Sequence, residues 1–202
     1  MSDKILNWPS KVELVGQKVK LVPLEAAHKE ALLEAASDGK LWELWYTSVP
    51  STATIDQYLN FAFSERELAK ATPFVVIDKS TDKLIGSTRY CNIDQSNKRL
   101  EIGYTWYAQS YQRTGVNTEC KYLLLQYAFE ELGYIAVEFR THWYNYRSRR
   151  AIARLGAKQD GVLRNHRLYP DGSTRDTVVF SIIDREWLAV KNSLEYEMER
   201  YK

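Results

Sequence analysis

The chain has 202 residues, enough for one domain with a sizeable hydrophobic core. Apolar residues make up 45% and charged residues 27%, so the composition excludes a disordered chain, a collagen and a coiled coil. The net charge of +2 argues against bulk electrostatic affinity for nucleic acid or for an anionic membrane. The first residues lack the apolar run of a signal peptide, and no stretch is long enough for a transmembrane helix. We therefore expect a soluble cytoplasmic protein.

The first half of the chain is predicted to alternate between strands and helices. Residues 1–17 are expected to form an N-terminal extension on the surface, and the alternating pattern of Lys18–Glu25 predicts a first strand. Helices are predicted at Ala27–Ala36, Leu41–Trp45 and Ile55–Ala69, the last with Thr54 as its N-cap. The apolar runs Pro73–Asp78 and Ile85–Cys91 flank the turn sequence KSTDK and predict a β-hairpin.

The second half begins with a strongly alternating strand, Arg99–Tyr107. Alternation predicts that Leu100, Ile102, Tyr104 and Trp106 share one face and that Glu101, Gly103 and Thr105 share the other. The elements predicted after it are a helix Val116–Leu132 ended by Gly133, a strand Ile135–His142, a helix Tyr146–Leu155 ended by Gly156, strands Lys158–Leu168 and Arg175–Ile183, and a helix Asp184–Tyr201.

These elements predict one α/β (α+β) domain whose mixed central sheet has about seven strands flanked by helices. The helix between Arg99–Tyr107 and Ile135–His142 makes a βαβ crossover, so these two strands should be parallel or splayed. Residues 188–202 are expected to form a C-terminal helix packed on the same domain.

The cysteines and histidines do not indicate a bound metal. Cys91 and Cys120 fit small apolar residues of a reduced intracellular protein better than a disulfide. His28, His142 and His166 are far apart in sequence, and neither they nor the cysteines have metal-ligand spacing. We therefore expect no metal site.

The turn SYQRTGVNTEC, residues 110–120, has the physical properties of an anion-binding loop. It joins a strand to a helix, whose first amides lack intrahelical acceptors and lie at the positive end of the helix dipole. Gly115 would let the backbone approach a ligand closely, and Arg113 adds a charged donor. The loop has neither the Rossmann glycines nor the Walker lysine, so the residues alone leave a plain helix start equally open.

The loop sequence QRTGVN, Gln112 to Asn117, resembles the Q/R-x-x-G-x-G/A acyl-CoA loop of the GNAT superfamily of N-acetyltransferases. Four other segments resemble, in the same order, the branch that acetylates ribosomal-protein N-terminal alanine and serine: EIGYTWY, TECKYLLLQYAFEELG, NYRSRRAIARLGA and RDTVVFSIIDREW. The resemblance covers residues 18–187, which we take as an acetyltransferase domain. The family loop usually ends in Gly or Ala. This chain has Asn117 there, and its larger side chain would either crowd a bound pyrophosphate or donate to it.

The resemblance implies acetyl-CoA as a co-substrate and assigns its binding to particular residues. Helix residues Arg147, Arg149, Arg150 and Arg154 could simply form a solvated face, and Arg150 is our first choice as a phosphate partner. A nucleic-acid patch is a third explanation for these arginines, which the near-neutral charge argues against. The residues expected to bind the cofactor are Trp106, Gln112, Arg113, Thr114, Gly115, Val116, Asn117, Asn145 and Arg150.

Acetyl transfer to an amine needs a base for the amine proton and an acid for the departing thiolate. Glu101 is the candidate base; the alternative is a strand glutamate that faces solvent or pairs with an arginine. Ser148 is the candidate acid by resemblance; the alternative is that Asn145 only caps the helix and Ser148 is an exposed first-turn residue. No nucleophile motif is visible, which favours direct attack in a ternary complex over a covalent acyl-enzyme.

The acceptor is expected to be a primary amine. The resemblance favours a protein N-terminus, such as that of a ribosomal protein, and a small-molecule or antibiotic-like amine is the alternative. Aromatic residues expected near the acceptor are Trp42, Trp45, Tyr46 and Tyr104, although most aromatic residues serve as core. A non-catalytic acyl-CoA-binding domain is the alternative of a different class. We expect no nucleic-acid or membrane partner, and the resemblance makes a homodimer one expected assembly.

Overall fold

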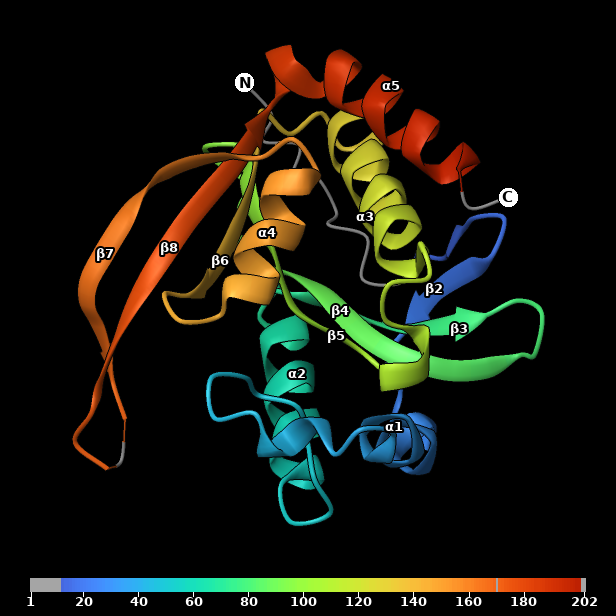
Figure 1. The fold of residues 1–202 in the computed structure, drawn as a ribbon, viewed down its shortest axis with the longest axis vertical. Coiled ribbons are helices and arrows are strands. Elements are labelled where there is room, and N and C mark those ends of the chain that lie inside the picture. The colour runs from blue at the N-terminus through green and yellow to red at the C-terminus, as the bar shows by residue number, and fades with distance from the viewer. Residues whose placement is uncertain (1–11, 170, 201–202) are drawn as a thin grey trace.

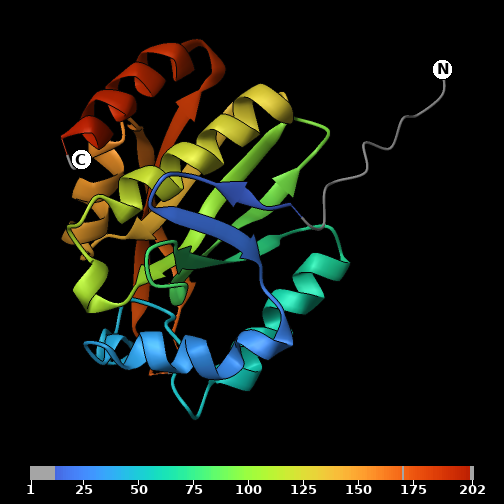
Figure 2. The same cartoon turned by 90° about the vertical axis from the view of Figure 1, so that its right-hand side faces the viewer.

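The computed structural model describes residues 12–169 and 171–200, which form a sheet of eight strands with helices on both faces (Figures 1 and 2). This confirms the predicted α/β domain. The seven predicted strands correspond to β2–β8, and a short edge strand, β1, lies in the predicted N-terminal extension. The predicted extension and C-terminal helix include residues 1–11, 201 and 202, which lie outside the described residues.

The strands are β1 Leu14–Val15, β2 Val19–Pro23, β3 Thr72–Asp78, β4 Lys83–Asp94, β5 Arg99–Tyr107, β6 Ala136–His142, β7 Lys158–Leu168 and β8 Thr174–Ile183. The α-helices are α1 Lys29–Ser37, α2 Ile55–Glu67, α3 Val116–Gln126, α4 Tyr146–Arg154 and α5 Asp184–Glu199. The order of strands in the sheet is β1-β2-β3-β4-β5-β6-β8-β7. The predicted hairpin is confirmed, since β3 and β4 pair antiparallel.

The sheet opens between β5 and β6. These strands are parallel, as the crossover predicts, but they pair only at Arg99–Ala136, Leu100–Val137 and Glu101–Glu138. Beyond these pairs the strands diverge, and each stays bonded only to its outer neighbour. The facing edges of β5 residues 102–107 and β6 residues 139–142 therefore offer backbone groups to an extended ligand.

A β-bulge in β5 changes which side chains share a face. Gly103 pairs with Arg89 and Trp106 with Ser87, so β5 has one more residue than β4 over this interval, and Tyr104 takes a φ of +51°. The predicted faces are therefore wrong beyond Gly103. Thr105 turns toward α3, whereas Trp106 packs in the core under α1 and α2.

Two hydrophobic cores lie on opposite faces of the sheet. One contains side chains from α3, α4 and α5, such as Leu124, Ile152 and Leu194, packed on the β-strands. The other contains side chains from α1 and α2, such as Leu32 and Leu59. Figure 2 shows α1 and α2 across the sheet from α3 and α5. Helices therefore cover both faces of the sheet around the opening between β5 and β6.

Two helix predictions need correction. The predicted Leu41–Trp45 helix is only a 3-10 turn over Leu41–Glu43, because the backbone becomes extended at Leu44. Thr54 stands at the N-cap of α2, but its hydroxyl accepts a hydrogen bond from Ser51 N at 2.9 Å and caps no helix amide.

The helix predicted over Val116–Leu132 changes type along its length. It is α-helical to Gln126 and continues as a π-helical turn over Tyr127–Glu131, closed by the bond from Leu132 N to Tyr127 O. Gly133 follows with a φ of +64°, and Gly156 ends α4 with a φ of +93°, so both predicted glycine stops are confirmed.

Both cysteines, Cys91 and Cys120, are buried and free, as predicted for the reduced form. Within residues 12–169 and 171–200, none of the helices combines the length and the apolar character needed to cross a bilayer.

Candidate active site

The predicted anion-binding loop follows β5 and is held by its own side chains. Gln112 Nε2 donates to the Tyr107 carbonyl at 3.0 Å, and Thr114 Oγ1 donates to the Tyr111 carbonyl at 2.7 Å. Gly115 is the N-cap of α3 with a φ of +89°, a conformation that favours glycine. Gln112 and Thr114 therefore shape the loop with their side chains, and their part in cofactor binding stays a prediction.

The start of α3 presents free backbone donors. The first hydrogen bond of the helix runs from Glu119 N to Gly115 O, so the amides of Val116, Asn117 and Thr118 have no intrahelical acceptor. The Val116 side chain is buried in the core and anchors this turn. Free amides at the positive end of a helix dipole favour an anion.

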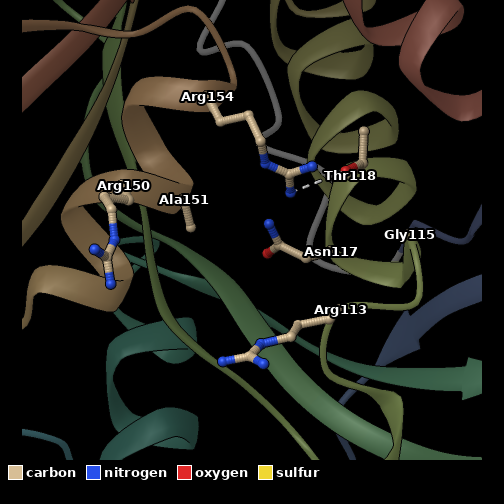
Figure 3. Close-up of a pocket in the computed structure, with 7 residues that line it drawn as sticks. All are labelled: Arg113, Gly115, Asn117, Thr118, Arg150, Ala151 and Arg154. Atoms are coloured by element: carbon tan, nitrogen blue, oxygen red, sulfur yellow. Dashed lines mark hydrogen bonds between the residues drawn. The ribbon is translucent and has the colours of Figure 1, made fainter.

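A pocket of about 280 Å³ lies between the start of α3 and one side of α4 (Figure 3). Its lining residues are Arg113, Gly115, Asn117, Thr118, Arg150, Ala151 and Arg154. Three of them are arginines that approach from two separate elements, and none of these described lining residues carries a carboxylate. Their guanidinium groups match phosphate oxygens in geometry and in charge.

Asn117 points its side-chain amide into this pocket (Figure 3). The amide is half-buried and lies among the arginines, where it can donate to an anionic oxygen. Asn117, which stands where the family loop usually has Gly or Ala, thus changes the lining of the pocket and leaves the loop intact.

The structure adds pocket residues that the sequence prediction left out. Thr118 and Ala151 line it, and so does Arg154, whose Nη2 donates to Thr118 Oγ1 at 3.3 Å. Arg154 is four residues after Arg150 and therefore lies on the same side of α4. This spacing could have predicted that both arginines line one pocket. Thr118 is fully buried and gave no such signal.

Trp106 does not lie in the pocket. Its indole is buried in the core beneath α1 and α2, on the far side of β5 from α3. Its main chain pairs with Ser87 of β4, and its carbonyl lies against Gly86 of the same strand. A role for Trp106 in cofactor binding stays a prediction.

Ser148 lies in the first turn of α4, which Asn145 caps. Asn145 Oδ1 accepts a hydrogen bond from Ser148 N at 3.0 Å. The Ser148 hydroxyl is half-buried and makes no hydrogen bond to another described residue. The capping alternative therefore holds for Asn145 and for the Ser148 amide, and the Ser148 hydroxyl stays available for chemistry.

Glu101 occupies the last paired position of β5, where the opening between β5 and β6 begins. Its side chain is buried, so the solvent-facing alternative is wrong, while Arg140 Nε lies 3.6 Å from Oε2 as the pairing alternative requires. Asn92 Nδ2 donates to the same oxygen at 2.7 Å. Burial raises the pKa of Glu101, and the Asn92 and Arg140 contacts only partly oppose this rise.

Glu138 is the β6 partner of Glu101 and has a different environment. It accepts hydrogen bonds from Arg99 Nη2 at 2.5 Å and from Arg140 Nη2 at 2.9 Å. Burial opposes its ionisation, but these bonds prevail and lower the pKa of Glu138. Of the two neighbouring carboxyl groups, Glu101 is thus the one whose pKa is shifted toward that of a general base.

Aromatic rings gather at the end of β6. The ring centroids of Trp45 and His142 are 4.8 Å apart, and Tyr46, Tyr144 and Tyr169 lie next to them. Trp45 and Tyr144 are exposed. Trp45 and Tyr46, in the segment after α1, therefore form an aromatic wall with these rings at the end of β6, and their role in acceptor binding stays a prediction.

The other two predicted acceptor residues lie elsewhere. Trp42 is exposed on the 3-10 turn Leu41–Glu43, and Tyr104 packs on Arg89 and Phe61 beneath α2. His142, which sequence analysis considered only as a metal ligand, accepts a hydrogen bond from Tyr144 N at Nδ1, so the neutral ring carries its proton on Nε2. Among the described residues no group of three or more His, Cys, Asp or Glu side chains could hold a metal ion.

Known proteins resemble this chain in sequence and in fold. A Bacillus subtilis protein named "Putative ribosomal N-acetyltransferase YdaF" is 36% identical over 104 residues, which cover 52% of this chain and 56% of that protein. A structure titled as a GCN5-related N-acetyltransferase from Brucella melitensis has a TM-score of 0.82 and 30% identity, and the match covers 96% of this chain and 90% of the other. The acetyltransferase MccE, solved with acetyl-CoA and AMP, shares the fold with a TM-score of 0.71 and 19% identity, over 83% of this chain and 93% of MccE.

Residues 18–158 match the family described as "Acetyltransferase (GNAT) domain". This match includes the sheet from β2 to β6, the loop with its free amides, and α4 with its arginines. The chain therefore belongs to the GNAT acetyltransferase family.

Proposed function

We propose that the protein is an acetyl-CoA-dependent N-acetyltransferase that transfers an acetyl group to a primary amine in a ternary complex. The observation that carries this proposal is the pocket where the free amides at the start of α3 meet Arg113, Arg150 and Arg154. It fits a pyrophosphate because it combines backbone donors and positive charge, with no carboxylate among the lining residues that the structure describes. Bound acetyl-CoA would supply the activated acetyl group as a thioester.

The opening between β5 and β6 offers a route from this pocket toward Glu101. The backbone edges of residues 102–107 and 139–142 would accept the amide groups of the pantetheine arm. Glu101 lies where this opening begins, so an acyl group carried along it would approach the candidate base. The proposed site thus follows the opening between β5 and β6.

The proposed roles of the side chains follow from their surroundings. Glu101, whose pKa is raised by burial, accepts the amine proton directly or through water as the amine nitrogen attacks the acetyl carbon. Arg140 and Asn92 hold the Glu101 carboxylate in place. The Ser148 hydroxyl, free within the described residues, donates a proton to sulfur as the carbon–sulfur bond breaks.

The acceptor is proposed to be a protein N-terminus, since the name of the Bacillus subtilis relative includes a ribosomal N-acetyltransferase. A small-molecule amine is the second candidate, because the aromatic wall of Trp45, His142 and Tyr144 would pack well on a compact acceptor. Homodimer formation and the absence of nucleic-acid and membrane partners also stay proposals.

Two measurements test the proposed function. Acetyl-CoA should raise the melting temperature, and a variant with Arg113 and Arg154 both changed to Gln should lose most of that rise. Wild-type protein should then release CoA thiol when given peptides with a free N-terminus or small primary amines. No rise with acetyl-CoA would refute the cofactor site. A rise without thiol release from any amine would support the binding-only alternative.

A further inference from the structure

A buried cation on β4 has no hydrogen-bond partner among the described residues. Arg89 is 1% exposed, and its Nε, Nη1 and Nη2 atoms are all buried and unsatisfied. Burial of an ionised group without compensating hydrogen bonds is strongly unfavourable, and a guanidinium carries five N–H donors. Such a group is expected to meet an acceptor that the described chain does not contain.

Aromatic rings surround Arg89 and leave its hydrogen-bonding edge unsatisfied. The guanidinium carbon lies 4.0 Å from the ring centroid of Tyr104, 5.0 Å from Tyr58 and 5.8 Å from Phe61. Ring faces stabilise the positive charge, but they accept none of the in-plane N–H bonds. Such an aromatic cage fixes the orientation of the planar guanidinium group, which suits bidentate binding of a carboxylate.

Arg89 is also close to the candidate base. It pairs across the sheet with Gly103, which lies two residues after Glu101 and on the same face. A side chain at Gly103 would place its Cβ 3.1 Å from Glu101 Oε1 and 3.0 Å from Cys91 Sγ, so the Glu101 carboxyl group leans over this glycine. The β-bulge at Tyr104 brings the aromatic ring onto the guanidinium beside it.

We infer that Arg89 binds a carboxylate of the amine acceptor, so that the acceptor carries its carboxylate close to the amine that Glu101 deprotonates. This inference rests on the proposed function. An amine at Glu101 and a carboxylate at Arg89 would straddle Gly103, which is the cross-strand partner of Arg89 and lies under the Glu101 carboxyl group. A free amino acid and a peptide with an acidic residue beside its N-terminus both offer this chemistry.

The test compares acceptors that differ in one carboxylate. Thiol release is measured with serine against serinamide and with peptides that begin Ser-Glu against Ser-Gln, in wild type and in Arg89→Met. In wild type, kcat/KM should be about 10- to 100-fold higher for the carboxylate-bearing acceptor of each pair than for its amide partner. In Arg89→Met this ratio should be at least about tenfold smaller. Comparing ratios between proteins cancels the difference in amine pKa within a pair.

Each pair identifies one source of the carboxylate. Discrimination within the serine pair alone indicates a small acceptor, and discrimination within the peptide pair alone indicates an acidic N-terminal segment. Equal ratios in wild type and Arg89→Met, or no preference in either pair, would overturn the inference. The melting temperature with CoA and each carboxylate gives a readout independent of turnover: a rise in wild type that is absent in Arg89→Met is expected, and no rise in wild type refutes the site.

Structural controls separate binding from folding. Methionine removes the buried charge and has a similar volume, so Arg89→Met should be at least as stable as wild type and should bind acetyl-CoA unchanged. Arg66 is the matched control because it also lies over a ring, that of Phe63 at 4.9 Å, but its Nη1 is satisfied by the Leu24 carbonyl. Arg66→Met should lose stability and keep the carboxylate preference. A loss of stability in Arg89→Met comparable to that of Arg66→Met would overturn the inference.

Discussion

Lys121 is a buried lysine whose replacement should stabilise the protein. It lies on α3, and its Nζ donates to Thr105 Oγ1 at 2.5 Å and to Thr88 Oγ1 at 3.3 Å. No carboxylate of the described residues pairs with it. Burial lowers the pKa of Lys121 to about 7 from an ordinary value of 10.5. The charged form is therefore much less favourable in the folded protein than in the unfolded chain.

The pKa of Lys121 sets the size and the sign of the effect. The difference in pKa corresponds to roughly 5 kcal/mol, since one pH unit is worth about 1.4 kcal/mol. Below pH 7 both states are protonated and the folded state bears the full penalty. Between about pH 7 and 10.5 the unfolded chain binds more protons, so the free energy of unfolding contributed by Lys121 rises with pH.

Lys121→Met removes the charge and keeps an unbranched side chain. The two threonine hydroxyls stay bonded to each other at 2.7 Å, so neither becomes unsatisfied. We expect a gain of about 1–4 kcal/mol in the free energy of unfolding at pH 7. The gain should shrink toward zero as the pH approaches 10.5, because the lysine of the unfolded chain then also loses its proton and its deprotonation in the folded state costs little.

Urea unfolding of wild type and variant at pH 6.5, 8 and 9.5 measures this difference, and other titrating groups cancel in the subtraction. Lys20→Met is the matched control, since Lys20 pairs with Asp82 at the surface and should change the free energy by about 0.5 kcal/mol or less at every pH. A destabilised Lys121→Met at pH 7, or a gain that does not change with pH, would refute the reasoning.

The other predictions concern catalysis and cofactor binding. Glu101→Gln should lower kcat about 10²- to 10⁴-fold and remove the acidic limb of the pH–rate profile, which burial should place above pH 4.5; an unchanged limb would rule Glu101 out as base. Ser148→Ala should lower turnover at least about tenfold with acetyl-CoA affinity unchanged, because the capping bond uses its backbone amide; full activity would leave Ser148 only as a capping position. Arg150→Gln should weaken acetyl-CoA binding about 3- to 10-fold at low salt and less at high salt, whereas Arg147→Gln, outside the pocket, should not.

The anion-binding loop shows how far local sequence reaches. Gly115 and the following helix start predicted free amides, and the structure has them because any α-helix leaves its first amides without acceptors. Arg150 was identified through the resemblance. The convergence of Arg113 and Arg154 on one pocket required the packing of α4 against α3, which no local pattern encodes.

The alternation in β5 shows where the local pattern fails. The period of two predicted the faces of Leu100 to Gly103 correctly, because these residues pair regularly with their neighbours. The bulge at Tyr104 then exchanged the two faces. A bulge depends on how two strands pair, so the sequence of one strand does not reveal it.

The sequence by itself determined the order and type of most elements, the glycine stops and the loop with its helix start, because all of these depend on neighbours along the chain. Tertiary structure alone decided that β5 and β6 diverge after Glu101, that Glu101 and Glu138 have opposite pKa shifts, and that Arg89 is buried in an aromatic cage without an acceptor from the described part of the chain. Each of these depends on desolvation and on partners from distant parts of the chain. Such contacts arise only when the sheet and its helices come together.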